Sequence, residues 1–332
     1  MASLDPDHLN PDSILIIRYS ALGDVMLATS VLAPLRERFP NAQIEWLSRK
    51  LYLPLLKGIS GLDQVHALED FQHFKRFDWV IDLQNKLRTR LISLRAAPRR
   101  LYFRKRSITE SIAAAFGHDP PLQRAHATTL FANVLAPLGI SSPGPLQIAI
   151  QPEAQATASV LLRAACRPLI ALAPGAGWAT KRWAIERFAA VGNQLVDQGA
   201  DLVLVGGPVD SGLLSELQRL LKRPALVNLS RQPLSVMAAV LAEVDLLLAS
   251  DSGPVHIATA LKTKTLVLFG PTSPIRWGPP TPSQSLALGL SCSPCSNHGT
   301  AKCPLGHHRC LTDLSEQEVF QRLRGMLPLK FS

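Results

Sequence analysis

The sequence predicts an α/β protein built from two doubly wound, parallel-sheet domains. Short apolar runs alternate with longer amphipathic segments along the chain, a pattern typical of strands covered by helices on both faces of a parallel sheet. The chain has 332 residues, more than one ordinary hydrophobic core accommodates, so two domains are expected. A hydrophobic content of 47% with 18% charged residues is typical of a well-buried globular protein.

Seven apolar runs are predicted to be buried strands. They span 14–17, 44–47, 79–83, 169–173, 202–205, 246–249 and 265–269. The clearest helical patterns between and after them cover 186–198, 211–221 and 316–324. A helix over 25–38 is also expected, with a kink or an early break at Pro34, because proline removes a backbone hydrogen bond. Turn-rich stretches at 141–146 and 151–154 predict the linker between domains 1–150 and 151–332.

Asp24 is the candidate catalytic residue of the first domain. It follows the predicted strand 14–17 and the turn residue Gly23, where strand gives way to helix. Ligands of open α/β sheets bind at that edge, and a carboxylate there can act as a general base. The alternative is a plain helix cap, since aspartate is a favoured N-cap residue.

The second domain contains a candidate phosphate site. Strand 169–173 runs into a glycine-containing loop and then a helix, and backbone amides at such a junction favour anions. Thr180 and Lys181 would add a hydroxyl group and a point charge. The spacing matches neither a Walker A loop nor GxGxxG, so an ordinary strand–helix turn is the alternative interpretation.

A second junction of the same kind follows strand 246–249. Ser252 and Gly253 precede a helix opened by Pro254, and His256 would lie in its first turn, either near a phosphate or as a structural histidine. Two anion-friendly helix starts in one domain indicate a pyrophosphate. Asp210 follows a third strand and is the candidate ligand for ribose hydroxyl groups.

The formal net charge of +10 indicates an anionic partner without identifying it. Nine basic residues and no acidic residue lie between positions 86 and 106. They are Lys86, Arg88, Arg90, Arg95, Arg99, Arg100, Arg104, Lys105 and Arg106. A solvated helix face explains some of them. Only Tyr102 and Phe103 are interleaved aromatics, so a platform for single-stranded nucleic acid is not expected.

Several motifs together resemble glycosyltransferase family 9, the ADP-heptose:lipopolysaccharide heptosyltransferases of Gram-negative bacteria. The matching segments run in family order across nearly the whole chain, and together they are highly specific. They are 18–24 (RYSALGD), 174–176 (PGA) with 180–183 (TKRW), 205–208 (VGGP), 251–258 (DSGPVHIA) and 269–274 (FGPTSP). Ser30 and Ala184 stand where the family often has proline, at positions not expected to contact the reacting groups.

The resemblance implies a GT-B fold, in which two Rossmann-like domains face a central cleft. It implies an inverting, metal-independent transfer of heptose from ADP-heptose to the inner core of lipopolysaccharide. Asp24 matches the family's catalytic base and Lys181 the lysine on the donor phosphates. The donor loop matches Asp251, Ser252 and Gly253. One displacement with inversion needs a base on one face of the donor carbon and charge stabilisation on the other.

The acceptor is expected to bind the first domain. Arg18, Lys86 and Arg88 are the candidate acceptor-binding residues, and the basic run suits a phosphorylated glycolipid at the inner membrane face. A start without basic residues argues against a secretory signal, and no apolar run is long enough for a membrane span. The expected location is therefore cytoplasmic, with peripheral attachment to the inner membrane as one option. A protein acceptor is the alternative within the enzyme class, and a non-catalytic nucleic-acid binder is a weaker one.

Four of the five cysteines cluster near the C-terminus, at Cys292, Cys295, Cys303 and Cys310. In a cytosolic chain, such a C-x2-C-x7-C-x6-C cluster favours metal over disulfides, although only the first pair has regular zinc spacing. His298, His307 and His308 could substitute. Relatives that glycosylate proteins carry a four-cysteine metal finger, so zinc and iron are both open as a structural ion, remote from the reaction. Reduced thiols in a structured loop are the alternative. No cofactor is expected for catalysis.

Overall fold

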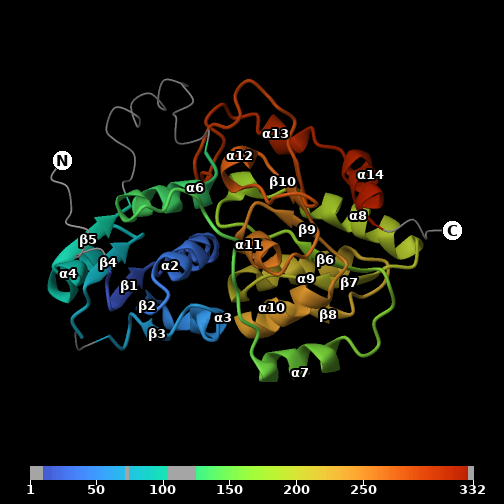
Figure 1. Ribbon diagram of the computed structural model, residues 1–332. Coiled ribbons are helices and arrows are strands. Elements are labelled where there is room, and N and C mark those ends of the chain that lie inside the picture. Colours follow the sequence, from blue (N-terminus) through green and yellow to red (C-terminus); the bar gives the residue numbers. More distant parts are fainter. Residues whose placement is uncertain (1–9, 72–74, 104–124, 328–332) are drawn as a thin grey trace. The chain divides into compact units, whose positions relative to one another are not determined.

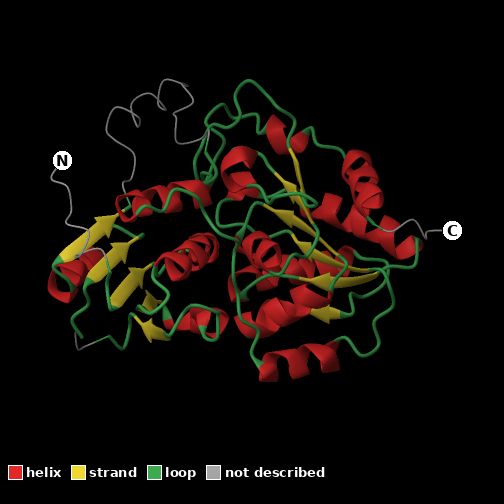
Figure 2. Cartoon of the chain, in the orientation of Figure 1, coloured by secondary structure: helices red, strands yellow, loops and turns green. Residues whose placement is uncertain are grey.

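The computed structural model describes residues 10–71, 75–103 and 125–327. These residues form two compact α/β units, and the chain passes from unit 1 to unit 2 between Ala149 and Ile150. Each unit contains one wholly parallel sheet with helices beside it (Figures 1 and 2). The predicted fold class, an α/β protein with two doubly wound parallel sheets, is confirmed.

Unit 1 contains a five-stranded sheet in the order β3-β2-β1-β4-β5. Its strands are β1 Ser13–Ile17, β2 Gln43–Ser48, β3 Gln64–Ala67, β4 Trp79–Asp82 and β5 Arg99–Tyr102. Its helices are α1 Leu22–Ala28, α2 Leu32–Arg38, α3 Leu53–Leu56, α4 Leu87–Ala96 and α6 Ala127–Ala132. Short 3₁₀ segments lie at Thr29–Val31, Lys50–Tyr52 and Asn133–Leu138.

Unit 2 contains a six-stranded sheet in the order β11-β10-β9-β6-β7-β8. Its strands are β6 Leu169–Ala173, β7 Asp201–Leu204, β8 Val227–Asn228, β9 Leu246–Ser250, β10 Thr265–Leu268 and β11 Gln284–Leu286. Its helices are α7 Pro152–Leu161, α8 Ile185–Asp197, α9 Ser211–Leu220, α10 Leu234–Glu243, α11 Gly253–Ala260, α12 Pro274–Trp277, α13 Arg309–Thr312 and α14 Glu316–Met326. Its 3₁₀ segments are Ala179–Lys181, Pro208–Asp210 and Leu229–Arg231.

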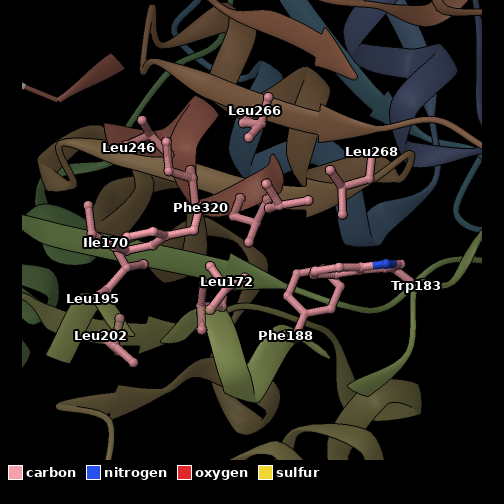
Figure 3. Packing of buried hydrophobic residues seen from close by; sticks show 14 of the residues in the cluster. Ile170, Leu172, Trp183, Phe188, Leu195, Leu202, Leu246, Leu266, Leu268 and Phe320 are labelled. Carbon is pink, nitrogen blue, oxygen red and sulfur yellow. The ribbon is translucent and has the colours of Figure 1, made fainter. Parts of the chain in front are cut away.

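The core of unit 2 follows from the two-residue period of its strands (Figure 3). Ile170 and Leu172 of β6 point to one face of the sheet and pack with Phe188 and Leu195 of α8. The rings of Trp183 and Phe188 meet edge to face, with centroids 5.3 Å apart. Intervening residues such as Ala171 are also fully buried. Both faces of this parallel sheet are therefore buried, which requires a layer of helices on each side.

The predicted helix 25–38 is interrupted in the structure. It consists of α1, a 3₁₀ turn and α2, and the interruption lies just before Pro34. Pro34 has no N–H group to donate to the carbonyl of Ser30, four residues earlier. The backbone N–H of Gly144 donates to that carbonyl instead, at 2.8 Å. The proline therefore frees an acceptor that fastens the end of unit 1 to this helix.

The segment 151–154, predicted as part of a turn-rich linker, instead opens α7. Gln151 is the N-cap residue and Pro152 occupies the first turn, where a missing N–H group costs nothing. All seven predicted strands are present. Four short strands were not predicted, and β3, β5, β8 and β11 all lie toward the edges of the two sheets, with partly exposed residues.

Candidate active site

The strand order of each sheet fixes where a ligand site is expected. In unit 1 the order reverses between β1 and β4, and in unit 2 it reverses between β6 and β9. Loops after the carboxyl ends of such a strand pair diverge and leave a crevice, where open α/β sheets bind ligands. Asp24 follows β1 and Lys181 follows β6, while Asp251 comes directly after β9. The candidate residues therefore belong to the switch point of their own unit.

In unit 1, Asp24 forms an ion pair with Arg18. Arg18 Nη2 lies 2.5 Å from Asp24 Oδ2, and the two side chains are 8% and 20% exposed. Helix α1 begins at Leu22, so Asp24 is the third residue of the helix and not its N-cap. The alternative interpretation of Asp24 as a plain cap is therefore wrong, and its carboxylate stays partly accessible.

Arg18 is held by groups on two further elements of unit 1. Its Nη1 donates to the carbonyl of Leu83 at 2.5 Å, and its guanidinium lies 5.4 Å from the ring centroid of Phe131. With the residue only 7% exposed, these contacts leave little of the guanidinium for a ligand. The acceptor-binding role of Arg18 stays a prediction, and in the structure its guanidinium contacts Asp24, Leu83 and Phe131.

Asp82, at the end of β4, is a fully buried carboxylate beside this ion pair. Its Oδ1 accepts hydrogen bonds from the backbone N–H groups of Gln84 and Asn85. Its Oδ2 has no hydrogen-bond partner among the described residues. Burial is the main cause that raises the pKa of Asp82, and these backbone donors, the Thr89 side chain and Arg18 only partly oppose it.

In unit 2, Lys181 forms an ion pair with Asp251. Lys181 Nζ lies 2.8 Å from Asp251 Oδ2, and the side chains are 14% and 5% exposed. The same carboxylate oxygen accepts a hydrogen bond of 2.6 Å from Thr272 Oγ1. The structure thus brings Lys181 and Asp251 together. A lysine of this kind can bind a phosphate group, and the carboxylate of Asp251 balances its charge.

The start of α11 lies next to this pair. Ser252 is its N-cap residue and Gly253 its first residue, and both are partly accessible. Ser252 Oγ donates to the carbonyl of Ser250 at 3.0 Å. His256 is 5% exposed and its ring lies 6.5 Å from that of Trp277. The backbone at Ser252 and Gly253 is available to an anion, whereas His256 belongs to the packed interior.

Thr180 is hydrogen-bonded to Thr300 in the structure. Its hydroxyl donates to the carbonyl of Thr300 at 2.8 Å and accepts from the Thr300 backbone N–H at 2.9 Å. The residue is 4% exposed. The hydroxyl group of Thr180 thus holds the loop around Thr300, and its contact with a donor phosphate stays a prediction.

Asp210 is also engaged within the protein. Its Oδ2 accepts from the backbone N–H of Gly207 at 3.0 Å. A side chain at Gly175 would meet Asp210 Oδ1 at 2.5 Å, so the carboxylate lies against the loop that follows β6. Asp210 is therefore near the loop after β6 that leads to Thr180 and Lys181, and its contact with ribose hydroxyl groups stays a prediction.

Lys86 and Arg88 lie at the start of α4 and are both exposed. Arg88 Nη2 donates to the carbonyl of Leu68 at 3.3 Å. Six of the nine residues of the basic run are described, and none of these six has an ion-pair partner among the described residues. Arg104, Lys105 and Arg106 lie outside the described residues. The described part of the run is a surface of uncompensated positive charge.

The four clustered cysteines converge on one small cavity of about 20 Å³. His307 lines the cavity too, and its Nε2 lies 4.0 Å from Cys292 Sγ. All four thiols are free. No group of three or more His, Cys, Asp or Glu side chains in the described part of the chain has the geometry of a metal site. The predicted cluster is thus assembled, but its sulfurs do not stand at ligand positions.

The thiols differ in how readily they ionise. Burial, followed by the charges of the other three cysteines, raises the pKa of Cys310 to about 11. Burial and then the charges of Cys303 and Cys292 raise the pKa of Cys295. Burial also opposes ionisation of Cys303, but the backbone N–H groups of residues 305–308 outweigh it and lower its pKa. A cation among these sulfurs would relieve their mutual repulsion.

The cysteine loop, residues 292–310, is not remote from the candidate donor site. His308 Nε2 lies 2.8 Å from the carbonyl oxygen of Thr180. A side chain at Gly299 would meet the Lys181 side chain at 2.8 Å. Ser296 donates its backbone N–H to the carbonyl of Pro271, next to Thr272. The loop therefore contacts residues beside both members of the Lys181–Asp251 pair, while the remoteness of the four thiols from the reaction stays a prediction.

Sequence reasoning did not identify the supporting residues Asp82, Thr272, Thr300 and His308. Asp82 had a usable signal, because it is an acid inside an otherwise apolar strand. His308 was considered only as a substitute metal ligand, and Thr300 carried no signal. Thr300 lies 120 residues from Thr180 in sequence, and Thr272 belongs to a matching motif without being singled out.

Comparison with solved structures assigns the class of fold. The structure of Escherichia coli ADP-heptose LPS heptosyltransferase II matches with a TM-score of 0.76, 22% identity and coverage of 95% of this chain and 98% of that one. The iron-containing dodecameric glycosyltransferase TibC of enterotoxigenic E. coli matches with a TM-score of 0.62 and 11% identity, over 96% of this chain and 76% of that one. The two parallel-sheet units thus have the GT-B fold of these neighbours.

The sequence comparisons then assign the family. The model of glycosyltransferase family 9 (heptosyltransferase) matches residues 72–305, and the chain belongs to that family. Lipopolysaccharide heptosyltransferase 2 of Escherichia coli K12 is 25% identical over 95% of this chain and 98% of its own length. Lipooligosaccharide heptosyltransferase 2 of a Campylobacter jejuni strain is 30% identical over 166 residues, 48% of this chain. That alignment spans about half the length of the Campylobacter relative, 52%.

Proposed function

We propose that this enzyme transfers heptose from ADP-heptose to the inner core of lipopolysaccharide, with inversion at the donor carbon. The observation that carries the proposal is the placement of Asp24 and Lys181 after switch-point strands in a member of family 9. The names of the aligned relatives and of the neighbouring E. coli structure support the donor and the acceptor. We propose further that unit 1 binds the acceptor and unit 2 the donor.

Asp24 is the general base in this proposal. Its carboxylate would accept the proton of the acceptor hydroxyl as the oxygen attacks the donor carbon. Arg18 supports this role, because its contacts with Leu83 and Phe131 fix the direction in which the paired Asp24 carboxylate points. A positioned general base contributes about 10²–10⁴-fold in rate.

Lys181 stabilises the leaving nucleotide diphosphate. Negative charge grows on the phosphate oxygen as the bond to the sugar breaks, and a fixed ammonium group nearby lowers the energy of that state. Asp251 holds Lys181 through Oδ2, and Thr272 holds Asp251. The backbone amides at Ser252 and Gly253 would add hydrogen bonds to the same anion.

The acceptor is proposed to be a phosphorylated glycolipid, presented at the inner face of the membrane. Lys86 and Arg88 are exposed, and no ion pair compensates their charge among the described residues. Such side chains can bind phosphate groups at low desolvation cost. No helix in the described ranges has the length and apolar character needed to cross a membrane.

We propose that the cysteine cluster holds one structural metal ion, zinc or iron. The donor set fits such an ion, because four sulfurs and His307 surround a cavity that accommodates a single water-sized occupant. Binding would draw the sulfurs inward from their present positions. The ion would stabilise the loop that supports the Thr180–Lys181 turn, and no step of the transfer passes through it.

A protein is the second acceptor class, because the family resemblance links a four-cysteine metal finger to relatives that glycosylate proteins. The neighbour TibC, which matches in fold alone, is an iron-containing glycosyltransferase. The two acceptor classes are separated by one experiment. Purified enzyme is incubated with ADP-heptose and either heptose-deficient lipopolysaccharide or a cell-protein fraction, and the labelled product is identified by mass.

A donor panel completes the test of function. ADP-heptose is compared with UDP- and GDP-sugars, and Asp24→Asn is the matched inactive control. Transfer from ADP-heptose to the lipopolysaccharide core is the expected result. Transfer from another nucleotide sugar alone, or activity that survives in Asp24→Asn, would contradict the proposal.

A further inference from the structure

Helix α4 exposes an apolar stripe that unit 1 does not cover. Leu87, Leu91 and Leu94 are 77%, 50% and 56% exposed. They account for three of the nine large hydrophobic side chains that are exposed in the described part of the chain. Single exposed leucines are common on protein surfaces. Three on one helix of 10 residues form a contiguous patch, which marks an interaction site.

The arrangement around the helix is ordered. At roughly 100° per residue, the three leucines fall within about 60° of one another, on one side. The buried residues Thr89, Ile92, Ser93 and Ala96 lie on the opposite side, where α4 packs against β4. Arg90 lies on one flank of the leucines, and Arg88 and Arg95 lie on the other. The leucines therefore point directly away from the sheet, between two basic margins.

The charge of this surface selects its partner. Arg88, Arg90 and Arg95 have no carboxylate partner among the described residues, and no acidic residue occurs between Asp82 and Glu110. Arg90 donates instead to the side chain of Asn85 and lies over the ring of Tyr102. Leucines flanked by arginines on both sides suit the boundary of an anionic bilayer. Apolar side chains enter its acyl region there, and arginines contact its phosphate headgroups.

We propose that α4 is a membrane-docking surface, in which Leu87, Leu91 and Leu94 insert into an anionic phospholipid bilayer and Arg88, Arg90 and Arg95 bind its headgroups. The inference extends the proposed function by naming the surface that would bring unit 1 to a membrane-borne acceptor. Its occupant is a lipid surface and not a second copy of the chain, because two such faces would bring their arginines into mutual repulsion.

The test measures binding to vesicles by co-sedimentation, with no sugar donor or acceptor present. Vesicles of phosphatidylethanolamine with phosphatidylglycerol are compared with vesicles of phosphatidylcholine alone. The wild-type protein should bind the anionic vesicles at least about tenfold more tightly, and raising the salt to about 0.5 M should weaken that binding.

The leucines are tested with a matched control. Leu87→Ser should weaken vesicle binding by about tenfold, because a mostly exposed leucine would otherwise enter the bilayer. Leu51→Ser is the control, because Leu51 is also in unit 1 and 60% exposed but lies outside α4. It should bind like the wild type. The triple variant Leu87→Ser, Leu91→Ser, Leu94→Ser should lose binding while its thermal unfolding changes little. Arg90→Gln with Arg95→Gln should lose the preference for anionic vesicles.

Three results would overturn the proposal. They are absence of wild-type binding to anionic vesicles, equal loss in Leu51→Ser and Leu87→Ser, and a wild-type dimer that the triple variant dissociates. Transferase activity is measured separately on a water-soluble, deacylated acceptor. An inactive protein that still binds vesicles through α4 would refute only the proposed function, and an active protein that binds no vesicle would refute only the docking surface.

Discussion

The ion pair between Lys181 and Asp251 makes a prediction that does not depend on knowing the substrate. Both side chains are largely buried, at 14% and 5% exposure, and the charged atoms are 2.8 Å apart. Lys181→Met keeps most of the side-chain stem but leaves Asp251 as a buried carboxylate supported only by Thr272. Removing one partner of a buried pair costs about 3–5 kcal/mol. The lower end, about 3 kcal/mol, applies here because Thr272 still donates a hydrogen bond.

The double variant separates this cost from the loss of packing. Asp251→Asn alone leaves an unpaired ammonium group, so it should also destabilise the fold. Lys181→Met with Asp251→Asn leaves neither charge, and its cost should be smaller than the sum of the two by about 2–3 kcal/mol. Each kcal/mol corresponds to about 2–4 °C in melting temperature for a unit of this size. Thermal and urea unfolding of the four proteins measure the coupling directly.

The functional consequence of Lys181→Met is measured on the same samples. ADP binding should weaken, and kcat/KM should fall by about 10²–10³-fold, because the missing charge acts on the leaving phosphate. Additive destabilisation by the two single changes would refute the reasoning about the pair. Unchanged ADP affinity and unchanged rate would remove Lys181 from the donor site, whatever the stability results.

Four further predictions concern the remaining features. Asp24→Asn should lower turnover by about 10²–10⁴-fold and leave ADP affinity, measured by calorimetry, nearly unchanged; wild-type turnover with saturating acceptor would show that Asp24 is not the base. Thr180→Val should cost about 2 kcal/mol in urea unfolding and raise the KM for the donor, because both hydroxyl bonds to Thr300 are lost; Thr180→Ser should restore both, and a restored stability without a restored KM would separate the two roles. Cys292→Ser with Cys295→Ser should abolish bound zinc or iron in elemental analysis, lower the melting temperature and weaken ADP binding; a wild-type protein with no metal above trace and four reactive thiols would contradict the metal site. Asp82→Asn should raise stability at neutral pH. The raised pKa of Asp82 means that the unfolded chain releases this proton at lower pH than the folded protein. The wild type therefore loses stability as pH rises from the ordinary pKa of the unfolded carboxyl group through the raised pKa of the folded one. Equal pH profiles of unfolding for the two proteins would refute this.

The fold was predictable because its signals are local. Buried strands of a parallel sheet are continuous apolar runs, and β1, β6 and β9 carry runs of this kind that the sequence displays directly. The edge strands β8 and β11 lack a continuous apolar run, because they have only two and three residues and partly exposed faces. A break of the helix near Pro34 was expected. The partner of the freed Ser30 carbonyl was not, because Gly144 lies 114 positions further along the chain and no local sequence pattern indicates the contact.

The candidate site was predictable in its charged residues and not in its supports. Asp24 follows a strand end of unit 1, and Lys181 and Asp251 follow strand ends of unit 2, where topology brings such positions to the carboxyl edge of each sheet. Which of them pair is a matter of side-chain reach, so neither the Arg18–Asp24 nor the Lys181–Asp251 pair could be derived from spacing. Thr180 shows the limit most clearly. A hydroxyl beside a glycine loop indicates a phosphate ligand, yet this one is occupied by Thr300 from a loop far along the chain.

Under the proposed function, Lys181 pairs both with Asp251 and with the donor phosphate, and this has a consequence for turnover. An ammonium group with no internal counter-charge would hold a diphosphate product tightly and slow its departure. Asp251 already lies 2.8 Å from that ammonium group, so it can neutralise Lys181 as the diphosphate leaves. The ammonium group then exchanges its phosphate contact for a carboxylate contact, and no buried positive charge is left unpaired. Asp251 would thus limit product inhibition, in addition to orienting the lysine.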